Sequence, residues 1–398
     1  MMRTRILCLA IAATLGALTG CGDSGGSADS PDYDVAALDV GNYPTAPRDI
    51  EASRTAASGP RLEAARIGAA TPLPMEVDGR LIYKPTLYWE RRITPASSKE
   101  LPSIDNTEFK DLTAGLVAGW FTRGQRRESY GLGRALEMYA LRFTDATAAA
   151  TAATRIAGRQ QQVLPGAPIA IPGIPAATAK WSVTKRYLDA QLTKDTMLLM
   201  VRVEDPITEP VDTAPLAELA RRAFDKQLEG LKSYTPTPVD QLGSLPIDVD
   251  GMLSRTLQLE RNASEKDNGD LSMVLAKQAA LHAEFYPDLA RAAFADTGVD
   301  LVTYSDDRVY RTKDNNAAER LIAAFIDQEA EGYKTIDSPP HMPGVECFDL
   351  KDPKGNTFRY PPVCYVAVDR YVARIENKNV QQLYQQVAAQ YKLLIQGR

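Results

Sequence analysis

The sequence predicts an α+β protein of two similar units, each a mostly antiparallel sheet with helices on one face. A nine-residue motif occurs twice, as LPMEVDGRL at 73–81 and LPIDVDGML at 245–253, with six identical positions. A second pair of segments, 201–204 and 373–376, repeats at the same offset of 172 residues. Around these anchors, helix and strand patterns follow in the same order in both halves, roughly α-β-α-β-β-α.

The elements of the first unit are predicted from apolar periodicity and capping residues. Phe109, Leu112 and Trp120 recur at helical spacing, and Asp145 is a suitable N-cap for the alanine-rich segment that follows it. The predicted elements are a helix at 107–121, a strand at 134–143, a helix at 146–161, strands at 178–185 and 195–204, and a helix at 214–232.

The second unit repeats this order with its own apolar stripes. Val380, Leu383 and Val387 lie on one face of the last predicted helix. The predicted elements are a helix at 287–295, a strand at 299–311, a helix at 315–331, strands at 345–350 and 362–376, and a helix at 378–396.

The amino terminus has the parts of a bacterial lipoprotein signal, in the right order. Arg3 and Arg5 precede the uncharged apolar run 6–18, which is too short to cross a bilayer. The run leads into Leu-Thr-Gly-Cys at Leu18–Cys21, which resembles the lipobox of bacterial lipoproteins. The resemblance implies that the thiol of Cys21 is diacylated and that the signal is cut just before it. The overlapping string GDSGG at 22–26 spells a serine-protease motif, but here it is predicted to be linker, because no histidine precedes it.

The domain organisation follows from these signals and from composition. The segment 235–244, TPTPVDQLGS, is rich in turn-forming residues and is predicted to link the two units. The predicted parts are a signal peptide at 1–20, a flexible tether at 21–35, a first repeat domain at 36–234, a linker at 235–244 and a second repeat domain at 245–398.

Composition restricts the partners that we expect. The chain has 398 residues, and removal of the predicted signal peptide at 1–20 leaves a mature chain of 378 residues. Because the signal peptide contains two arginines and no acidic residue, the net charge changes from −5 to −7. A mildly acidic chain argues against nucleic acid as a partner. We expect the membrane as a partner, through acyl chains such as palmitate on Cys21, with an envelope protein or a lipid as a further ligand. The predicted location is the outer face of the cell membrane.

Two cysteines remain in the mature chain beside Cys21. Cys347 and Cys364 flank the turn signal Asp-Pro-Lys-Gly-Asn at 352–356, which predicts two antiparallel strands with the cysteines face to face. Outside the cytosol such a pair is expected to form a disulfide. The alternative, a reactive or metal-binding pair, has no Cys-x-x-Cys spacing to support it.

The chain resembles a family of actinobacterial, mycobacterial-type cell-envelope lipoproteins of unknown function. The resemblance spans most of the mature chain and implies its location and duplicated fold, but it implies no activity. The segments that carry it are Leu18–Cys21, Ala279-Ala280-Leu281-His282, Val309-Tyr310-Arg311-Thr312, Pro343-Gly344-Val345-Glu346-Cys347-Phe348 and Cys364-Tyr365-Val366-Ala367.

Residues that could carry catalysis or bind a metal are few. His282 stands near two carboxylates but lacks further ligands, and His341 lies in a proline-rich loop without a nucleophile nearby. Ser182 and Lys185 match Ser-x-x-Lys on a predicted strand, without its companion motifs. The aspartates Asp248, Asp250, Asp306 and Asp307 lack calcium-loop spacing. No catalytic residue, metal ligand or cofactor is predicted.

Three functions are compatible with this sequence. We expect a non-enzymatic binding or scaffold module of the cell envelope, which would use a cleft or loops of the duplicated domain. The alternative is a carrier of lipid or glycolipid, in which the apolar run Met197–Val201 would line a hollow. The same run also fits a strand buried on both faces, which we favour. A second alternative is a cell-wall hydrolase, for which the many acidic residues leave a carboxylate pair open.

Overall fold

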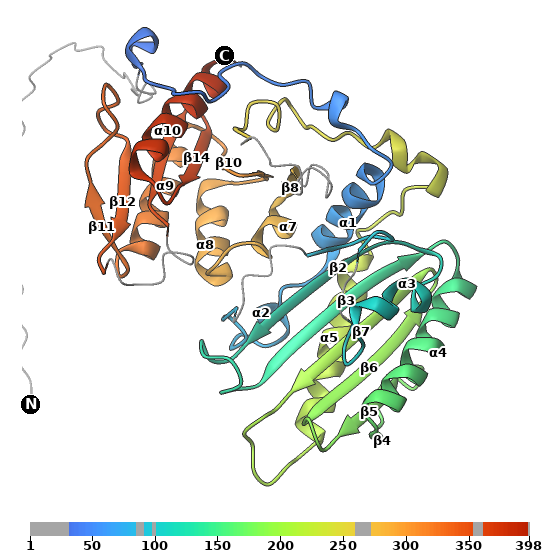
Figure 1. The fold of residues 1–398 in the computed structure, drawn as a ribbon. Helices are drawn as coiled ribbons and strands as arrows, with labels where there is room; N and C mark the ends of the chain where they lie inside the picture. The colour runs from blue at the N-terminus through green and yellow to red at the C-terminus, as the bar shows by residue number, and fades with distance from the viewer. Residues whose placement is uncertain (1–31, 85–90, 98–100, 259–271, 353–360, 397–398) are drawn as a thin grey trace, which may run out of the picture.

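A computed structural model of the protein describes residues 32–84, 91–97, 101–258, 272–352 and 361–396. These residues form two seven-stranded sheets, one in each half of the chain (Figure 1). All the strand pairings of both sheets are antiparallel. The predicted α+β class with two similar units is confirmed.

The first sheet lies in the N-terminal half, in the order β1-β2-β3-β7-β6-β5-β4. Its strands are β1 (Arg92–Ile93), β2 (Leu116–Gln125), β3 (Ala135–Phe143), β4 (Ala167–Pro168), β5 (Thr178–Ser182), β6 (Tyr187–Lys194) and β7 (Met197–Glu204). The helices of this half are α1 (Ser58–Ala70), α2 (Pro74–Val77), α3 (Phe109–Leu112), α4 (Ala146–Val163) and α5 (Ala214–Leu231), with 3-10 turns at Val35–Ala37, Glu51–Ser53, Asn106–Glu108 and Val239–Ser244.

The second sheet lies in the C-terminal half, in the order β11-β12-β13-β14-β10-β9-β8. Its strands are β8 (Met273–Ala276), β9 (Leu301–Tyr304), β10 (Arg308–Arg311), β11 (Tyr333–Ile336), β12 (Glu346–Leu350), β13 (Val363–Val368) and β14 (Tyr371–Glu376). Its helices are α7 (Lys277–Leu281), α8 (Pro287–Thr297), α9 (Asn315–Glu329) and α10 (Val380–Ile395).

The two sheets share one topology. Read from β8, the second sheet has the order β8-β9-β10-β14-β13-β12-β11, which matches the first position by position. The helix after the third strand begins alike in both halves, because Asp145 and Asp314 each accept from the backbone N–H three residues on. Arg202 on β7 and Arg374 on β14 hold equivalent places. The repeated segments are therefore equivalent in three dimensions.

The aspartate of the repeated Val-Asp-Gly motif makes a similar contact in each half. Asp78 forms an ion pair with Arg126, just after β2, at 2.7 Å. Asp250 forms an ion pair with Arg311 at the end of β10. In both copies the aspartate thus connects the motif to the C-terminal end of a strand.

Helices cover both faces of each sheet, so the expectation of helices on one face is wrong. On β7, Leu198 and Met200 join the apolar core under α4, whereas Leu199 and Val201 join the core that contains α5. Strand β7 is buried along its whole length. Because its side chains alternate between two packed cores, the run Met197–Val201 is packed on both faces and lines no hollow.

The predicted helix at 107–121 is also wrong. Helix α3 ends at Leu112, and strand β2 begins at Leu116. Between them Gly115 has φ of +82°, a left-handed conformation that ends the helical path. The apolar residues that fit a helical period also fit the paired, fully buried strand β2. Two predicted single strands, 299–311 and 362–376, are instead the hairpins β9–β10 and β13–β14.

The two halves share one hydrophobic core. It runs from Ile67 of α1 and Trp120 of β2 to Leu275 of β8 and Ala280 of α7. Figure 1 shows α1 and α7 between the two sheets. Lys84 of the N-terminal half connects the two halves further, because its Nζ donates to main-chain carbonyls at and just after the end of α7, including that of His282 at 2.7 Å. The halves are therefore packed against each other rather than loosely tethered.

The first residues that the structure describes, 32–39, are hydrogen-bonded to helix α10 of the C-terminal half. The backbone N–H of Tyr33 donates to the hydroxyl of Tyr391 on α10 at 3.3 Å, and Gln385 of the same helix donates to Asp39 at 2.9 Å. The segment 235–244 between the two halves includes a 3-10 turn, and its Thr237 is buried against α1.

Candidate functional site

Arg374, Tyr365 and Glu329 form a closed hydrogen-bonded group on the second sheet. Arg374 Nη2 donates to Glu329 Oε1 at 2.7 Å, and the Tyr365 hydroxyl donates to Glu329 Oε2 at 2.7 Å. Arg374 Nε donates in turn to the Tyr365 hydroxyl at 3.1 Å. Only 8% of the Arg374 side chain and 15% of the Glu329 side chain are exposed. Each side chain of the group is thus fixed by the other two.

Register and helical spacing bring these three residues together. Tyr365 on β13 and Arg374 on β14 are directly opposite each other, so their side chains share a face of the sheet. Helix α9 buries Leu321 and Phe325 against the same face. Glu329 follows Phe325 by four residues and therefore reaches the sheet at the end of the helix.

A second buried pair lies beside this group. Arg308 on β10 is the register partner of Arg374. Its Nη1 lies 3.5 Å from Glu284 Oε2, and Tyr310 donates its hydroxyl to Glu284 Oε1 at 3.1 Å. Two buried arginines on neighbouring strands therefore each face a carboxylate, as buried charges require.

The surroundings keep these groups in one ionisation state. Burial, and next the Glu329 carboxylate, raise the pKa of Tyr365 well above its ordinary value. Burial alone would lower the pKa of Arg374, but the neighbouring negative groups, Glu376 first among them, outweigh burial and raise it. Burial also raises the pKa of Tyr310. Near neutral pH the tyrosines are neutral and the arginine is charged.

A pocket of about 340 Å³ lies between the end of α9, the segment 284–286 and the end of β12. We call it the acidic pocket. Its aromatic residues are Phe285, Tyr286, Phe325 and Tyr333. Its charged residues are four carboxylates and two cations, which leave a net charge of −2: Glu284, Glu329, Glu331, Asp352, Lys351 and Arg374.

The two cations of the acidic pocket are engaged by the protein. Lys351 Nζ donates to the carbonyls of Ala330 at 2.7 Å and Glu331 at 3.2 Å, just after α9. Arg374 is held by Glu329. Glu329 and Glu284 are in turn paired with Arg374 and Arg308. The negative charge beyond these two pairs comes from Glu331 and Asp352, which line the same space as the aromatic rings, whose faces attract cations. A volume of this size suits a small organic molecule.

Cys21, the predicted lipidation residue, lies outside the described residues, as does the GDSGG string. Across the five ranges that the structure describes, no helix has both the length and the apolar character needed to cross a bilayer.

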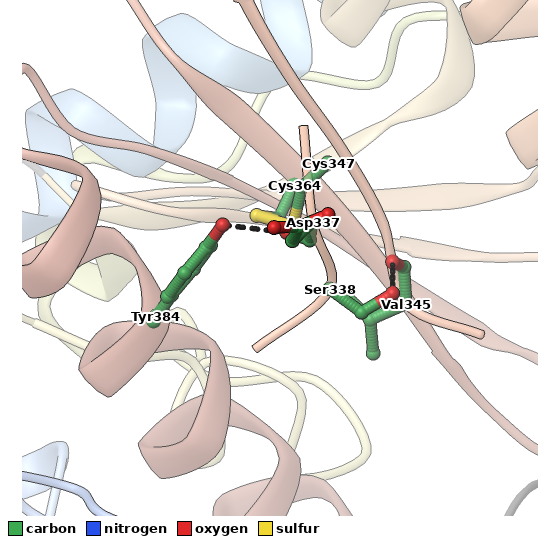
Figure 2. Close-up of a disulfide and its surroundings, with 6 residues drawn as sticks. All are labelled: Asp337, Ser338, Val345, Cys347, Cys364 and Tyr384. Carbon is green, nitrogen blue, oxygen red and sulfur yellow. Dashed lines mark hydrogen bonds between the residues drawn. A yellow bond between two sulfur atoms is a disulfide. The ribbon is translucent and has the colours of Figure 1, made fainter. Parts of the chain in front are cut away.

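Cys347 and Cys364 form a disulfide (Figure 2). They are register partners on β12 and β13, and both are fully buried in the core under α10. Tyr384 of α10 donates to the carbonyl of Asp337 at 2.5 Å close by. The turn between the two strands that the sequence indicated at 352–356 falls mostly outside the described residues.

His282 is fully buried at the junction of the two halves. Its Nε2 donates to the carbonyl of Thr71 at 3.1 Å, and its Nδ1 accepts from the hydroxyl of Thr122 at 2.9 Å. Because a carbonyl only accepts, the ring proton is assigned to Nε2. Burial lowers the pKa of His282 to about 3, so the imidazole stays neutral. The ring is therefore a packed residue of the core and not a metal ligand among the described residues.

The other candidate residues are not brought together. His341 is exposed in its loop, and Ser182 is buried at the end of β5 while Lys185 is exposed in the turn beyond. Asp248 accepts from the backbone N–H groups of Leu253 and Ser254. Within the described ranges, no group of three or more histidine, cysteine or acidic side chains is placed to hold a metal ion.

No pattern in the sequence predicts the acidic pocket. Arg374 belongs to the repeated segment 373–376 and Glu284 is close in sequence to His282, but nothing in the sequence links either residue to Glu329 or Tyr365. A signal was present, because Arg374 interrupts a strand whose adjacent residues are apolar. A lone arginine in such a strand needs a buried counter-charge, which the sequence alone does not identify.

Comparison with known proteins identifies the family but no activity. Among proteins with curated functions, none matches the chain. Residues 50–247 match the N-terminal domain of unknown function DUF7373, and residues 252–397 match the C-terminal domain of the same family. Together the two matches span most of the chain and divide it near the boundary between its two sheets. The chain therefore belongs to the two-part DUF7373 family.

Proposed function

We propose that the protein is a lipid-anchored, extracytoplasmic binding module of the actinobacterial cell envelope, and that its acidic pocket binds a small organic cation. The anchor is proposed from the signal at residues 1–20 and the lipobox cysteine Cys21. The buried Cys347–Cys364 disulfide supports export, because such bonds persist mainly outside the reducing cytosol.

The ligand class follows from the acidic pocket itself, the observation on which this proposal depends. Four aromatic residues line a space of about 340 Å³ whose charged residues carry a net charge of −2. A cationic amine gains from the aromatic faces and from the excess carboxylates together. The hydrogen-bonded group of Arg374, Tyr365 and Glu329 is already fixed before a ligand binds. Little conformational entropy of these side chains is therefore lost on binding.

Charge-neutralising variants test the ligand class. Glu331 and Asp352 both line the pocket; both are exposed, and Asp352 follows β12. The double variant Glu331→Gln/Asp352→Asn is expected to remove most of the thermal stabilisation that choline gives the wild type. The control Asp327→Asn changes an exposed carboxylate of α9 that does not line the pocket, and it should respond to choline as the wild type does. Equal stabilisation of all three proteins would contradict the proposal.

The anchor is tested separately by metabolic labelling with an alkyne fatty acid. The wild-type protein, expressed with its own signal, is expected to incorporate the label and to fractionate with membranes. The variant Cys21→Ala should lose both properties, because the acylated thiol is absent. If the wild-type protein stays unlabelled, the lipid anchor is refuted. The proposal that the acidic pocket binds a cation would not be affected by that result.

A further inference from the structure

A second pocket lies in the N-terminal half, beneath the helix that corresponds to α9. Gln160 follows the N-cap Asp145 of α4 by fifteen residues, as Glu329 follows the N-cap Asp314 of α9, so the two side chains hold equivalent positions. Glu329 lines the acidic pocket, and Gln160 lines a pocket of about 250 Å³. That space is enough for about eight water molecules or one small solute.

We call this second space the amide pocket, and its character differs from that of the acidic pocket. The polar groups that line it are mostly uncharged amides and a hydroxyl, with one ammonium and one carboxylate that balance each other: Gln160, Gln161, Gln191, Thr178, Lys180 and Asp189. Its lining therefore favours neither a cation nor an anion.

A relay of amides fixes one hydrogen-bond acceptor in this pocket. Gln160 Nε2 donates to the carbonyl of Pro102 at 2.8 Å, which turns Gln160 Oε1 towards Gln191. Gln191 Nε2 then donates to that oxygen at 2.9 Å. Gln191 is 5% exposed, and its own Oε1 has no hydrogen-bond partner among the described residues. A buried amide oxygen of this kind requires a donor, and Gln191 is one of the residues that line the pocket.

The charged groups of the amide pocket are held by the protein but keep some hydrogen-bonding capacity. Asp189 accepts from Arg202 through both oxygens, at 2.7 and 3.0 Å, and each oxygen retains a further lone pair. Lys180 Nζ donates to the carbonyls of Gln160 and Leu164 at the end of α4, which uses two of its three hydrogens. The pocket thus offers fixed acceptors and donors side by side.

We propose that the amide pocket is a second binding site, for a neutral polyhydroxyl ligand the size of a single sugar ring. Adjacent hydroxyls of such a ligand donate to Gln191 Oε1 and Asp189 and accept from Lys180 and Thr178. The duplicated fold then carries two sites of different chemistry, one for a cation and one for a neutral polyol. This site does not depend on what the acidic pocket binds.

Saturation-transfer NMR and calorimetry with four sugars test this site, using D-glucose, D-galactose, D-mannose and N-acetyl-D-glucosamine. The wild type is expected to bind at least one of them with millimolar affinity. Gln191→Met removes the acceptor at similar volume and should weaken binding about five- to ten-fold. Thr178→Val changes an exposed side chain and should weaken it by a similar factor without loss of folding. Gln162→Met, on the exposed side of α4, is the matched control and should bind as the wild type does.

Two results would overturn the inference. One is that none of the four sugars binds the wild type. The other is that the Thr178→Val and Gln191→Met proteins bind sugar as tightly as the wild type; if Gln191→Met fails to fold, Thr178→Val decides alone. Choline titrations of the same variants should match the wild type, so a failure here is distinguishable from a failure of the acidic pocket.

Discussion

The buried imidazole of His282 is expected to make folding stability depend on pH. The ring is fully buried, and both of its nitrogens are hydrogen-bonded, to Thr71 and Thr122. Burial lowers its pKa to about 3 in the folded protein, against 6.5 for the unfolded chain. Between these values the unfolded chain binds a proton that the folded protein does not, so stability falls as the pH falls below about 6.5.

The size of this effect can be worked out from the two pKa values. Protonation of the unfolded chain alone costs about 3 kcal/mol of unfolding free energy between pH 7.5 and pH 4.5. Most carboxylates titrate below this window, and the chain has only one other histidine, the exposed His341. Burial raises the pKa of Asp307 and Glu137, which opposes a loss of stability at falling pH, and it lowers the pKa of Lys84, which adds to such a loss. The part of the loss that belongs to His282 is therefore the difference between the wild type and a variant that lacks this histidine.

Urea unfolding at four pH values between 4.5 and 7.5 measures the effect. His282→Gln keeps an N–H donor and an oxygen acceptor but cannot be protonated, so its stability should change far less with pH. His341→Gln is the matched control and should retain the wild-type dependence. If His282→Gln and the wild type show the same loss between pH 7.5 and 4.5, the reasoning from burial is refuted.

Two further variants probe the packing of each half. Cys347→Ala/Cys364→Ala opens a loop with a sequence separation of 17 and should lower the unfolding free energy by about 3 kcal/mol in the chain-entropy model; an unchanged melting temperature by calorimetry would refute this. Glu63→Gln leaves the buried Arg142 without its counter-charge and should cost about 3–5 kcal/mol in urea unfolding. Its control, Glu51→Gln in a surface pair, should cost less than about 1 kcal/mol, and equal losses would contradict the argument.

The duplicated fold was predictable because its signals are local. The Val-Asp-Gly repeat and the apolar stripes of the long helices each depend on neighbouring residues, as does the helix start at Asp145. These helices appear within two residues of their predicted bounds: α4, α5, α8, α9 and α10. Local order of this kind is read directly from spacing and caps.

The remaining structure depends on contacts that are distant in sequence. The first part of strand β2 falls in the predicted helix at 107–121 because its apolar residues satisfy both periods, and only pairing with β3 decides between them. The same holds for the acidic pocket, since Glu329 and Arg374 are 45 residues apart and meet through the register of β13 and β14. The second covered face of each sheet likewise follows from packing between helices and strands rather than from any one segment.

The most direct test of the acidic pocket compares two ligands that differ in charge but hardly in shape. Choline and 3,3-dimethylbutan-1-ol are titrated by calorimetry into the wild-type protein under identical conditions. Because the pocket carries a net charge of −2 among aromatic rings, choline is expected to bind at least about ten-fold more tightly. Equal affinities, or no binding of choline, would contradict the proposed recognition of a cation.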